Sequence, residues 1–577
     1  MKCRDVVVKH KAELILGPLF KVLEVIFELL TPFLVRDIIN NGFVFDINNL
    51  VIGGNNEYIF IRGAVIFSFA ILGFCSTMVC QFLGCRAGCK VEEQIKNKIV
   101  EHYLSLAKKE VDNYGKGNII TLLSTDSTNV GHATLLAVRL LIRSPILIIG
   151  SLICALIINP FVGLIFIGVA VIVTLVLFFV IKYSSKKYIE IQKNLDEISS
   201  ITGDAIEGSR TIRAFNTKEK EIEEFDKSIS KYKDKNIKLG LVNAISNPMI
   251  FLAVNIGILL IIYYGGQYVN LGIFKSGDVV ALVNYLNQML LALVVTSDLV
   301  VVFTKGFASS KRINDYFAVS NSIESGDSTT SSDEEVIFKM DNVFYSYHQN
   351  NHYALRAVSL TIKKGETIGI IGGTGSGKST LLNLMSRVSD PTKGIVYFKG
   401  KDIKNYELSK IHQDISFITQ KNAIFKGTIR SNIVLNECFS EEEIDCAIVD
   451  SLVSTFVNKY EDGIEHLVEE GGKNLSGGER QRLLLARALI RNKKILLLDD
   501  SLSALDNITE RTILNNIKNK YKDITIIIVG EKLSSIRNAD TIYIFDKGKL
   551  VDSGTSDTLI STSSIYKNMH NIEAEGI

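Results

Sequence analysis

The stretch Thr367–Met385, which reads TIGIIGGTGSGKSTLLNLM, decides the fold of the C-terminal part of this chain. A β-branched strand pattern (Thr367–Ile371) leads into a glycine-rich run, and a helix pattern (Thr380–Met385) follows that run. Residues 372–379 fit G-x-x-x-x-G-K-[ST], and a preceding strand and a following helix are the context that this motif requires. The sequence therefore predicts a strand–loop–helix unit that binds phosphate groups.

The residue types of this loop suit the phosphates of ATP. Glycines let backbone N–H groups surround the phosphates without obstruction by Cβ atoms, and the helix N-terminus adds a partial positive charge. Lys378 would reach the β- and γ-phosphates, and Ser379 would ligate Mg²⁺. The candidate ATP-binding residues of the loop are Gly372, Gly373, Thr374, Gly375, Ser376, Gly377, Lys378, Ser379 and Thr380.

Two further motifs lie downstream. Lys494–Asp500 (KILLLDD) is typical of a buried strand that delivers Asp499 to its C-terminal edge, where the carboxylate would bind Mg²⁺; the alternative is a core strand with a polar cap. Residues 475–482 read LSGGERQR, and Ser476, Gly477 and Gly478 again offer a hydroxyl and bare amides to a phosphate. One nucleotide needs one such cradle, so we expect two chains to stack head to tail, each covering the other's nucleotide.

The N-terminal part of the 577-residue chain differs in composition and contains long apolar runs. Because a helix needs about 20 apolar residues to cross a bilayer, six segments qualify or nearly qualify, and the first and last are interrupted by polar residues. We expect membrane-spanning helices at 14–39, 59–84, 133–158, 161–183, 244–268 and 277–303.

The distribution of Lys and Arg predicts the orientation of these helices. The segments between the second and third helices and between the fourth and fifth are long and basic, whereas the first connection has no basic residue and the third is an Asn159-Pro160 turn. The N-terminus, the long segments and the C-terminal domain are therefore expected in the cytosol. The long segments have helical patterns, and 117–130 and 207–215 are candidates for contact with the ATP-binding domain; the alternative is a solvated hairpin without a partner.

Several charges fall at membrane depth. Lys21, Glu24 and Glu28 share one face of the first helix, and Arg139 and Arg143 share a face of the third. Such residues usually face a bundle interior or a wet cavity. They would form a polar translocation path, or pair with one another as Lys21 with Glu24 or Arg143 with a carboxylate of a neighbouring helix; both arginines could instead lie at the cytosolic leaflet.

A domain organisation follows from these patterns. We expect a transmembrane domain at 1–318, a Ser- and acid-rich flexible linker at 319–335, and an ATP-binding domain at 336–577. Formal net charge is only +2, which gives no reason to expect a nucleic acid as partner.

Five features follow one another along the chain: the loop 372–379, Gln420, the LSGGE segment, the adjacent acids Asp499 and Asp500, and Ser503–Asp506. Their order resembles an ATP-binding cassette (ABC) domain. The fused six-helix domain resembles the exporter branch of ABC transporters. The resemblance implies an all-α six-helix transmembrane domain of the ABC type-1 exporter kind, followed by an α/β P-loop NTPase domain with a helical subdomain. It also implies ATP and Mg²⁺ as ligands, a second half-transporter subunit as partner, and a lipid bilayer as surroundings.

The same resemblance assigns roles to single residues. Tyr347 matches the aromatic residue that stacks on adenine, Gln420 the residue that senses Mg²⁺ and the attacking water, and Asp506 the residue that crosses the dimer interface. The segment offered to the partner's ATP comprises Leu475, Ser476, Gly477, Gly478 and Glu479. The Mg²⁺ ligands would be Ser379, Gln420 and Asp499.

Two positions depart from the family pattern. Asp500 replaces the glutamate that polarises the attacking water, so its carboxylate would lie about 1.5 Å back, one C–C bond length, and a misplacement of about 1 Å can cost about a hundredfold in rate. Glu531 replaces the switch histidine that contacts the γ-phosphate. At about 4 Å and an effective dielectric of about 20, this like-charge contact would cost roughly 4 kcal/mol unless Glu531 turns away or is protonated.

Both departures affect one nucleotide site, whereas the P-loop and LSGGE are intact. This combination, with Val138–Pro145, resembles the subunit of bacterial heterodimeric multidrug exporters that houses the degenerate ATP site. The expected function is export of a small molecule, lipid or drug-like substrate. A slow homodimeric exporter and an ATP-gated channel or regulatory subunit are alternatives; six spanning segments argue against a soluble DNA-repair ATPase, and the fused domains argue against an importer.

Overall fold

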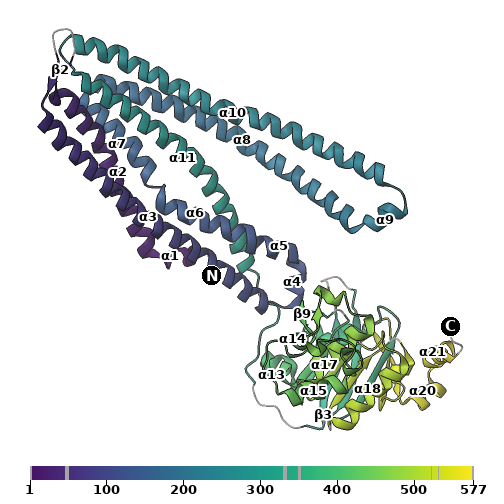
Figure 1. Ribbon diagram of the computed structural model, residues 1–577. Helices are drawn as coiled ribbons and strands as arrows, with labels where there is room; N and C mark the ends of the chain where they lie inside the picture. Colours follow the sequence, from purple (N-terminus) through teal and green to yellow (C-terminus); the bar gives the residue numbers. More distant parts are fainter. Residues whose placement is uncertain are drawn as a thin grey trace. The chain divides into compact units, whose positions relative to one another are not determined.

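The computed structural model describes residues 3–45, 51–328, 334–347, 352–420, 422–521, 523–530 and 532–574. The chain divides into two compact units (Figure 1). The first consists of Met1–Leu104 and Gly115–Val319, and the second of Ser105–Tyr114 and Ser320–Ile577.

The first unit is built of helices, several of them far longer than the helices of an ordinary soluble domain. A short antiparallel hairpin, β1 (Phe43–Phe45) with β2 (Val51–Gly54), precedes its longest early helix. The helices are α1 (Cys3–Val8), α2 (Lys11–Asp37), the π-helical η1 (Ile38–Gly42), α3 (Asn56–Ser105), α5 (Lys116–Thr121), the π-helical η2 (Leu122–Asp126), α6 (Ser127–Arg139), α7 (Arg143–Ile158), α8 (Pro160–Glu207), α9 (Ser209–Ala214), α10 (Lys218–Asn270) and α11 (Ser276–Phe317).

Five helical stretches in the described part of the chain are long and apolar enough to cross a membrane. They are Asn56–Ser105, Lys116–Ile158, Pro160–Ser184, Pro248–Asn270 and Ser276–Phe317. The first of the six segments expected from the sequence is not among them. It is helical as α2 and η1 and packs against α6, α7 and α11, but three charged residues interrupt its apolar run.

The third expected span is not one continuous helix. It is broken between α6, which ends at Arg139, and α7, which begins at Arg143. Pro145 is the third residue of α7. Because proline lacks an N–H and its ring clashes with the preceding turn, it is favoured in the first turn of a helix over the helix interior.

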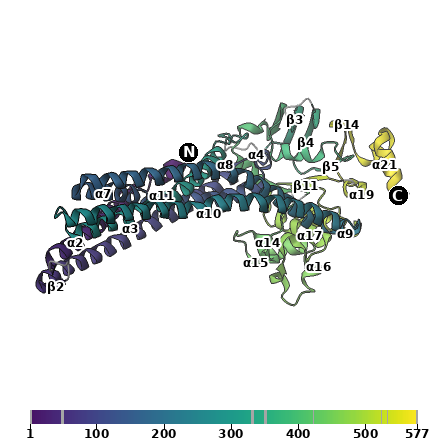
Figure 2. The ribbon, with the colours of Figure 1, turned by 90° about the horizontal axis from the view of Figure 1, so that it is seen from above.

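The turn expected at Asn159-Pro160 is present. Asn159 is extended, its side chain accepts hydrogen bonds from the backbone N–H groups of Phe161 (2.9 Å) and Val162 (3.3 Å), and Pro160 opens α8. An Asn cap followed by proline at the first helical position is a strong start signal. From there α8 and α10 run side by side, as Figures 1 and 2 show, with α9 at their tip. The helical pattern expected beyond the spans is thus present in the structure.

Four of the five charges expected at membrane depth form ion pairs. Lys21 Nζ lies 2.5 Å from Glu24 Oε2, and Arg143 Nη2 lies 3.0 Å from Glu28 Oε2. Arg143 Nε is 4.0 Å from Glu24 Oε1, so the two pairs adjoin. Of the alternatives open from the sequence, both forms of mutual pairing are present. Arg139 packs its side chain beside Gly84 of α3.

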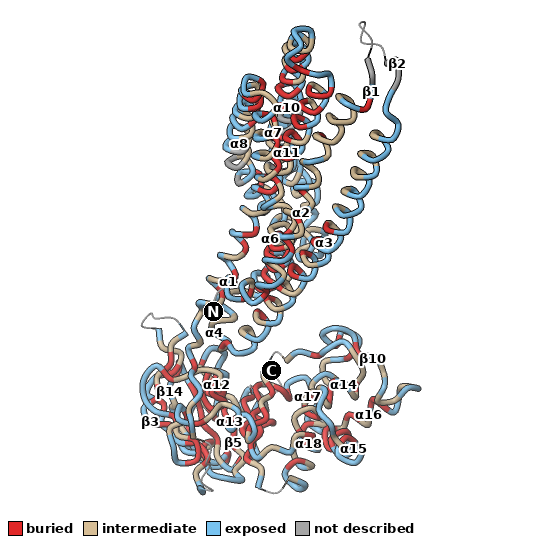
Figure 3. Tube along the Cα trace, turned by 90° about the vertical axis from the view of Figure 1, so that its left-hand side faces the viewer, coloured by how far each residue is buried: buried red, intermediate tan, exposed pale blue. Residues whose placement is uncertain are grey.

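The interior of the first unit lies mainly between α7, α8, α10 and α11. Tyr285 of α11 is fully buried and donates a hydrogen bond from its hydroxyl to the Leu29 carbonyl of α2 (2.7 Å). Figure 3 shows buried positions along α7, α10 and α11, while half of the residues of α3 are exposed. A broad apolar exposed surface is expected where a bilayer supplies the solvent.

The second unit contains two sheets. The six-stranded sheet has the order β14-β13-β5-β12-β11-β8 and is parallel except for β14; the four-stranded antiparallel sheet has the order β4-β3-β6-β7. The strands are β3 (Val336–Tyr345), β4 (Leu355–Lys363), β5 (Thr367–Gly372), β6 (Lys393–Phe398), β7 (Lys401–Asp402), β8 (Ile415–Ile418), β11 (Ile495–Asp499), β12 (Thr525–Val529), β13 (Thr541–Asp546) and β14 (Lys549–Gly554), with a separate pair β9 (Gly427–Thr428) and β10 (Leu467–Val468).

Helices surround these sheets, and those between β9 and β11 form a helical subdomain with its own apolar core. Residues of β5, β11 and β12 are almost all buried, as expected for parallel strands covered on both faces. The helices are α4 (Lys108–Tyr114), α12 (Lys378–Met385), α13 (Leu408–Asp414), α14 (Ile429–Val434), α15 (Glu441–Asp450), α16 (Ser454–Val457), α17 (Gly477–Leu489), α18 (Asn507–Lys520), α19 (Leu533–Ile536), α20 (Ser556–Thr562) and α21 (Ser564–Ala574), with 3₁₀ turns η3 (Ile403–Asn405), η4 (Gly463–Glu465) and η5 (Glu470–Gly472).

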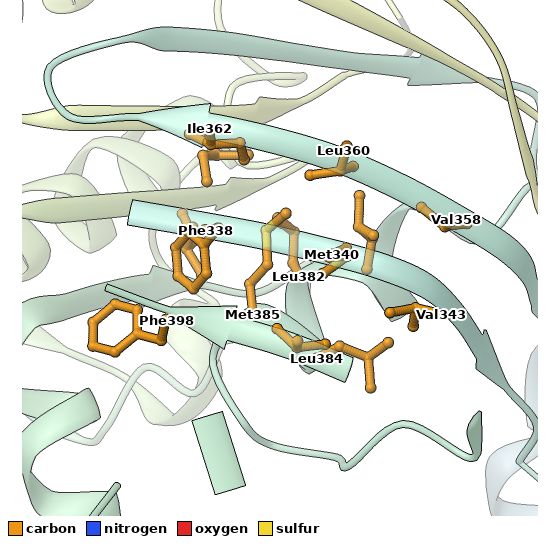
Figure 4. Close-up of a cluster of buried hydrophobic side chains, with 14 of the residues drawn as sticks. Phe338, Met340, Val343, Val358, Leu360, Ile362, Leu382, Leu384, Met385 and Phe398 are labelled. Atoms are coloured by element: carbon orange, nitrogen blue, oxygen red, sulfur yellow. The ribbon is translucent and has the colours of Figure 1, made fainter. Parts of the chain in front are cut away.

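One core holds the antiparallel sheet against α12. Figure 4 shows Phe338 and Met340 of β3, and Leu382 and Met385 of α12, directed into the same space. All four are buried. This packing fixes α12, and therefore the loop that precedes it, relative to both sheets.

The stretch expected to be a flexible linker is partly anchored in its described residues. Arg387 donates a hydrogen bond from Nη2 to the Glu324 carbonyl (2.5 Å), Gly326 N–H donates to the Tyr406 carbonyl (3.0 Å), and Ile323 is buried. Backbone partners therefore hold a segment whose composition has little to bury.

Candidate functional site

The phosphate-binding loop connects β5 to α12 and is shaped by two left-handed glycines. Gly375 and Gly377 have φ of +79° and +99°, values that glycine adopts without strain. A Cβ on Gly377 would lie 2.7 Å from the Ala354 carbonyl oxygen. The loop therefore requires glycine at this position both for its conformation and for its close approach to neighbouring backbone.

This loop borders a cavity of about 360 Å³ that brings together most of the residues predicted from sequence. Lys378 lies inside it, buried, and its Nζ donates hydrogen bonds to the carbonyls of Gly372 (2.7 Å) and Gly373 (2.9 Å). Bound phosphates would compete for this ammonium group. The predicted residues in the cavity wall are Tyr347, Thr374, Gly375, Ser376, Gly377, Lys378, Ser379, Thr380, Gln420, Asp499 and Asp500.

Three wall residues were not anticipated: Ala354, Val529 and Gly530. None has a functional group in its side chain, so no chemical signal marks them in the sequence. Ala354 precedes β4, Val529 ends β12, the strand between β5 and β11, and Gly530 follows it. Only the strand order places them at the cavity.

The two acids after β11 have different surroundings. Asp499 is buried, and its Oδ1 accepts a hydrogen bond from the Ser379 hydroxyl (2.9 Å). Burial raises the pKa of Asp499 above its ordinary value; the Ser379 hydrogen bond and the charge of Lys378 oppose this, and the charge of Asp500 adds to it. A buried carboxylate of this kind favours the arrival of a cation.

Asp500 has a left-handed backbone conformation, with φ of +50°. Its N–H donates to the Val529 carbonyl (3.0 Å), and its own carbonyl accepts from the Ser503 hydroxyl (2.9 Å). Aspartate is among the non-glycine residues that most often adopt this region. The backbone bonds hold Asp500 at the cavity wall between β11 and β12.

Tyr347 presents an exposed ring at the cavity edge. Its hydroxyl shares a hydrogen bond with the Thr380 hydroxyl (2.8 Å), and its ring meets Tyr345 edge-on with centroids 5.0 Å apart. The side chain is 49% exposed. A flat aromatic ligand could therefore stack on it.

The residues present fit Mg²⁺. Ser379, Asp499 and Gln420 supply oxygen ligands to one cavity, and a hard cation that keeps several waters binds through one or two carboxylates together with substrate phosphates. Among the described residues no cluster of three or more His, Cys, Asp or Glu forms a separate metal cage. When bound there, the ion would neutralise the negative charge of the phosphates.

The second segment predicted to bind phosphate, residues 475–479, lies elsewhere in the unit. Ser476 caps α17: its hydroxyl accepts from the Glu479 N–H (3.3 Å), and Glu479 Oε2 accepts from the Ser476 N–H (2.8 Å). Leu475 is buried in the core of the helical subdomain. None of residues 475–479 borders the cavity, so the two segments of one chain do not meet around one nucleotide.

Asp506, predicted to cross a dimer interface, does not border the cavity. Asp506 caps α18 by accepting a hydrogen bond from the Thr509 N–H (3.0 Å). Glu531 lies outside the described residues. Both stretches expected to contact the ATP-binding domain, 117–130 and 207–215, belong to the first unit.

A further segment was missed by sequence reasoning. Residues 105–114, which include α4, belong to the second unit. The Ala107 N–H donates to Asn321 Oδ1 (3.0 Å), and Asn321 Nδ2 donates to the Ser105 carbonyl (2.7 Å). The positive charge of Lys108 also acts on Asp499. Nothing in the polar composition of this turn signals such a position.

Comparison with known protein families identifies both parts of the chain. The family described as "ABC transporter transmembrane region" matches residues 14–293, and the family described as "ABC transporter" matches residues 355–503. The matched ranges together span most of the chain and include the cavity loop, the LSGGE segment and both acids.

Curated relatives match over similar lengths. An uncharacterized ABC transporter ATP-binding protein of Bacillus subtilis, YfiB, is 29% identical over 548 residues, which covers 95% of this chain and 94% of the relative. An ATP-dependent lipid A-core flippase of Pasteurella multocida is 28% identical, with 84% of each chain covered.

A solved structure shares the fold. A bacterial Atm1-family ABC exporter, determined with ATP bound, superimposes with a TM-score of 0.82 at 19% identity, covering 99% of both chains. The expected fold class, a helical transmembrane domain followed by an α/β nucleotide-binding domain, is thereby confirmed. The protein is an ABC exporter half-transporter, a multi-pass membrane protein in which a transmembrane domain is fused to an ATPase coupled to transport.

Proposed function

We propose that this chain is the subunit of a heterodimeric ABC exporter that houses the weakly hydrolytic ATP site. The observation that carries the proposal is Asp500, which stands beside Asp499 at the cavity wall where a water-polarising glutamate would have a longer reach. The second departure, Glu531, would repel the γ-phosphate that a histidine would bind. ATP would remain bound in this cavity and turn over slowly.

The LSGGE segment supports a pair of ATP sites with unequal hydrolytic activity. Its serine and two glycines are intact and lie apart from the chain's own cavity. In a head-to-tail pair they would complete the partner's ATP site, with Asp506 at the interface. Within the chain's own site, Tyr347 would stack on adenine, the loop 372–380 would bind phosphates, and Ser379, Gln420 and Asp499 would hold Mg²⁺.

The membrane arrangement is part of the same proposal. The domains would comprise residues 1–318, 319–335 and 336–577, with the N-terminus and the ATPase domain in the cytosol of a cell whose plasma or inner membrane holds the protein. The basic segments between the second and third helices and between the fourth and fifth support this orientation. The cargo would be a small molecule, lipid or drug-like compound, and the lipid A-core flippases among its relatives favour a lipid.

The test compares the full-length chain alone with the chain co-purified with its partner subunit. We expect the lone chain to bind ATP but to hydrolyse it slowly, and the pair to hydrolyse it readily. Asp499→Asn is the control for contaminating ATPases. Vigorous hydrolysis by the lone chain that disappears in Asp499→Asn would contradict the heterodimer and favour a homodimer whose own site is competent. Substrate-stimulated movement against a gradient would separate a pump from an ATP-gated channel.

A further inference from the structure

A second cavity, of about 620 Å³, lies between α18 and α19 in the second unit. Its floor is lined by Ile526 and Ile528 of β12 and by Glu510 of α18, all about 2% exposed. No residue borders both this cavity and the ATP cavity. Its volume falls within the range of about 300–1,000 Å³ that is usual for small-molecule sites.

Three cationic side chains lie at the rim of this cavity. Arg511 and Lys518 project from α18, and Arg537 follows α19; all three are exposed. Lys518 Nζ lies 3.8 Å from Asp540 Oδ1. Neither arginine side chain forms an ion pair or hydrogen bond with another residue in the part of the chain that the structure describes.

Two acids belong to the same surroundings. Asp540 faces Lys518, and Glu510 lies at the floor, where it is 2% exposed. The three cations outnumber these acids. Because Glu510 is shielded from solvent and both unpaired cations stand at the rim, an anion would bind at the rim and an apolar group would cover the floor.

We propose that this cavity binds a small phosphate-bearing molecule about the size of a nucleoside monophosphate. Guanidinium groups recognise phosphate through paired N–H donors, which Lys matches less well. The side-chain amides of Asn507, Asn515 and Asn538, all at the cavity wall, supply both donors and acceptors for a polar ring edge. Ile526 and Ile528 at the floor accept the face of the ring.

The position of the cavity allows a bound ligand to influence ATP hydrolysis. Asp506 caps the start of α18, and α19 begins two residues after Glu531. The two helices contact each other. A ligand held by Arg511 on one side and Arg537 on the other would fix the spacing of these helices and thereby regulate hydrolysis.

Binding is tested with AMP as the probe and with the purified full-length chain carrying Lys378→Ala, which weakens the ATP cavity. By calorimetric titration we expect one AMP per chain and at least tenfold weaker binding after Arg511→Gln with Arg537→Gln. The matched control is Lys339→Gln with Lys410→Gln, which removes the same charge from exposed sites on β3 and α13 and should leave binding unchanged. Arg511→Lys with Arg537→Lys should retain part of it.

A separate arm uses inorganic phosphate. Phosphate that competes as well as AMP would identify a simple anion as the occupant, whereas tighter AMP binding would identify a nucleotide. Absence of AMP binding, or equal binding by the glutamine variant, would overturn the proposal. These titrations do not depend on transport or on the partner subunit, so their failure is distinguishable from failure of the proposed heterodimer.

The proposed regulation is tested by measuring the rate of ATP hydrolysis. In the complete transporter, saturating AMP should change the rate of ATP hydrolysis, and the same AMP should have no effect when this chain carries Arg511→Gln with Arg537→Gln. An equal response in both proteins would overturn the regulatory role, because AMP would then act at another site.

Discussion

The hydroxyl of Ser379 donates a hydrogen bond to Oδ1 of Asp499 across 2.9 Å, which joins the first turn of α12 to the end of β11. The two residues are separated by 119 others in sequence and meet only because β5 and β11 flank the same strand, β12. The bond places a hydroxyl and a carboxylate where a cation and phosphates would share them.

Replacing Asp499 with Asn should stabilise the nucleotide-free protein. A raised carboxyl pKa in the folded state means that the charged form costs stability, and this cost appears as pH rises through the raised pKa. It is absent below the unfolded pKa of about 3.9. We therefore expect Asp499→Asn to melt at a higher temperature than the parent at pH 8, with a smaller difference at pH 5.

The measurement is thermal unfolding without Mg²⁺ or ATP. The control is Asp341→Asn, which changes an exposed side chain of β3. Mg²⁺ and ATP should stabilise the parent more than Asp499→Asn, since only a ligand that binds the folded state raises its stability. A lower melting temperature for Asp499→Asn at pH 8 would show that the charge is stabilised by the site.

Restoring the longer carboxylate should raise hydrolysis in this chain's own site. Asp500→Glu advances the carboxylate by about one C–C bond length, and a correction of about 1 Å is worth up to about a hundredfold in rate. Adding Glu531→His should raise the rate further by removing an anion near the γ-phosphate. ATP turnover is measured in the complete transporter with the partner's own site inactivated.

The same variant should lose some stability, because glutamate adopts the left-handed conformation of position 500 less readily than aspartate. Glu531→His alone serves as the comparison. If turnover stays at the parent level in the double variant, the two departures are not what slows this site.

Ser476→Ala should impair the partner's ATP site rather than this chain's own. Ser440 provides a closely matched control: it caps α15 with the same pair of distances, 3.3 Å from the Glu443 N–H to its hydroxyl and 2.8 Å from its N–H to Glu443 Oε2. Loss of either cap should cost about 1 kcal/mol of stability. Only Ser476→Ala should lower ATP turnover of the complete transporter, by tenfold or more, with ATP binding to the lone chain retained. Equal turnover by the Ser476→Ala and Ser440→Ala transporters would reduce the serine to a structural cap.

The pair formed by Glu28 and Arg143 should behave as a unit. Removing one partner leaves a charge at membrane depth without its counterion, and such changes cost about 3–5 kcal/mol when the pair is fully buried. The two side chains are 31% and 22% exposed, so we expect a smaller loss. Glu28→Gln and Arg143→Gln should each lower the melting temperature in detergent, and the double variant should recover much of the loss. Purely additive losses would mean that the two charges act separately.

Short stretches of sequence were sufficient to predict much of the local structure of this protein. The phosphate-binding loop, the capped start of α17 and the Asn159-Pro160 turn were predictable because each depends on the conformational preferences of a few adjacent residues. Of the six spans predicted from apolar length, five coincide with helical stretches that are long and apolar enough to cross a membrane. The prediction was less secure for α2, where three charges interrupt the apolar pattern. The break before α7 was not predicted, and Pro145 alone does not require it, because Pro248 lies inside α10.

Tertiary structure decided what distant residues do together. Which carboxylate pairs with Arg143 depends on the packing of α2 against α7, and the sequence allowed several partners. The strand order brings Ser379 to Asp499 and opens a second cavity beside Arg511 and Arg537, and the anchoring of residues 105–114 gives Lys108 its influence on Asp499. Periodicity and motifs act over a few residues and therefore determine elements, whereas these contacts arise from how whole helices and sheets pack, which no short stretch of sequence encodes.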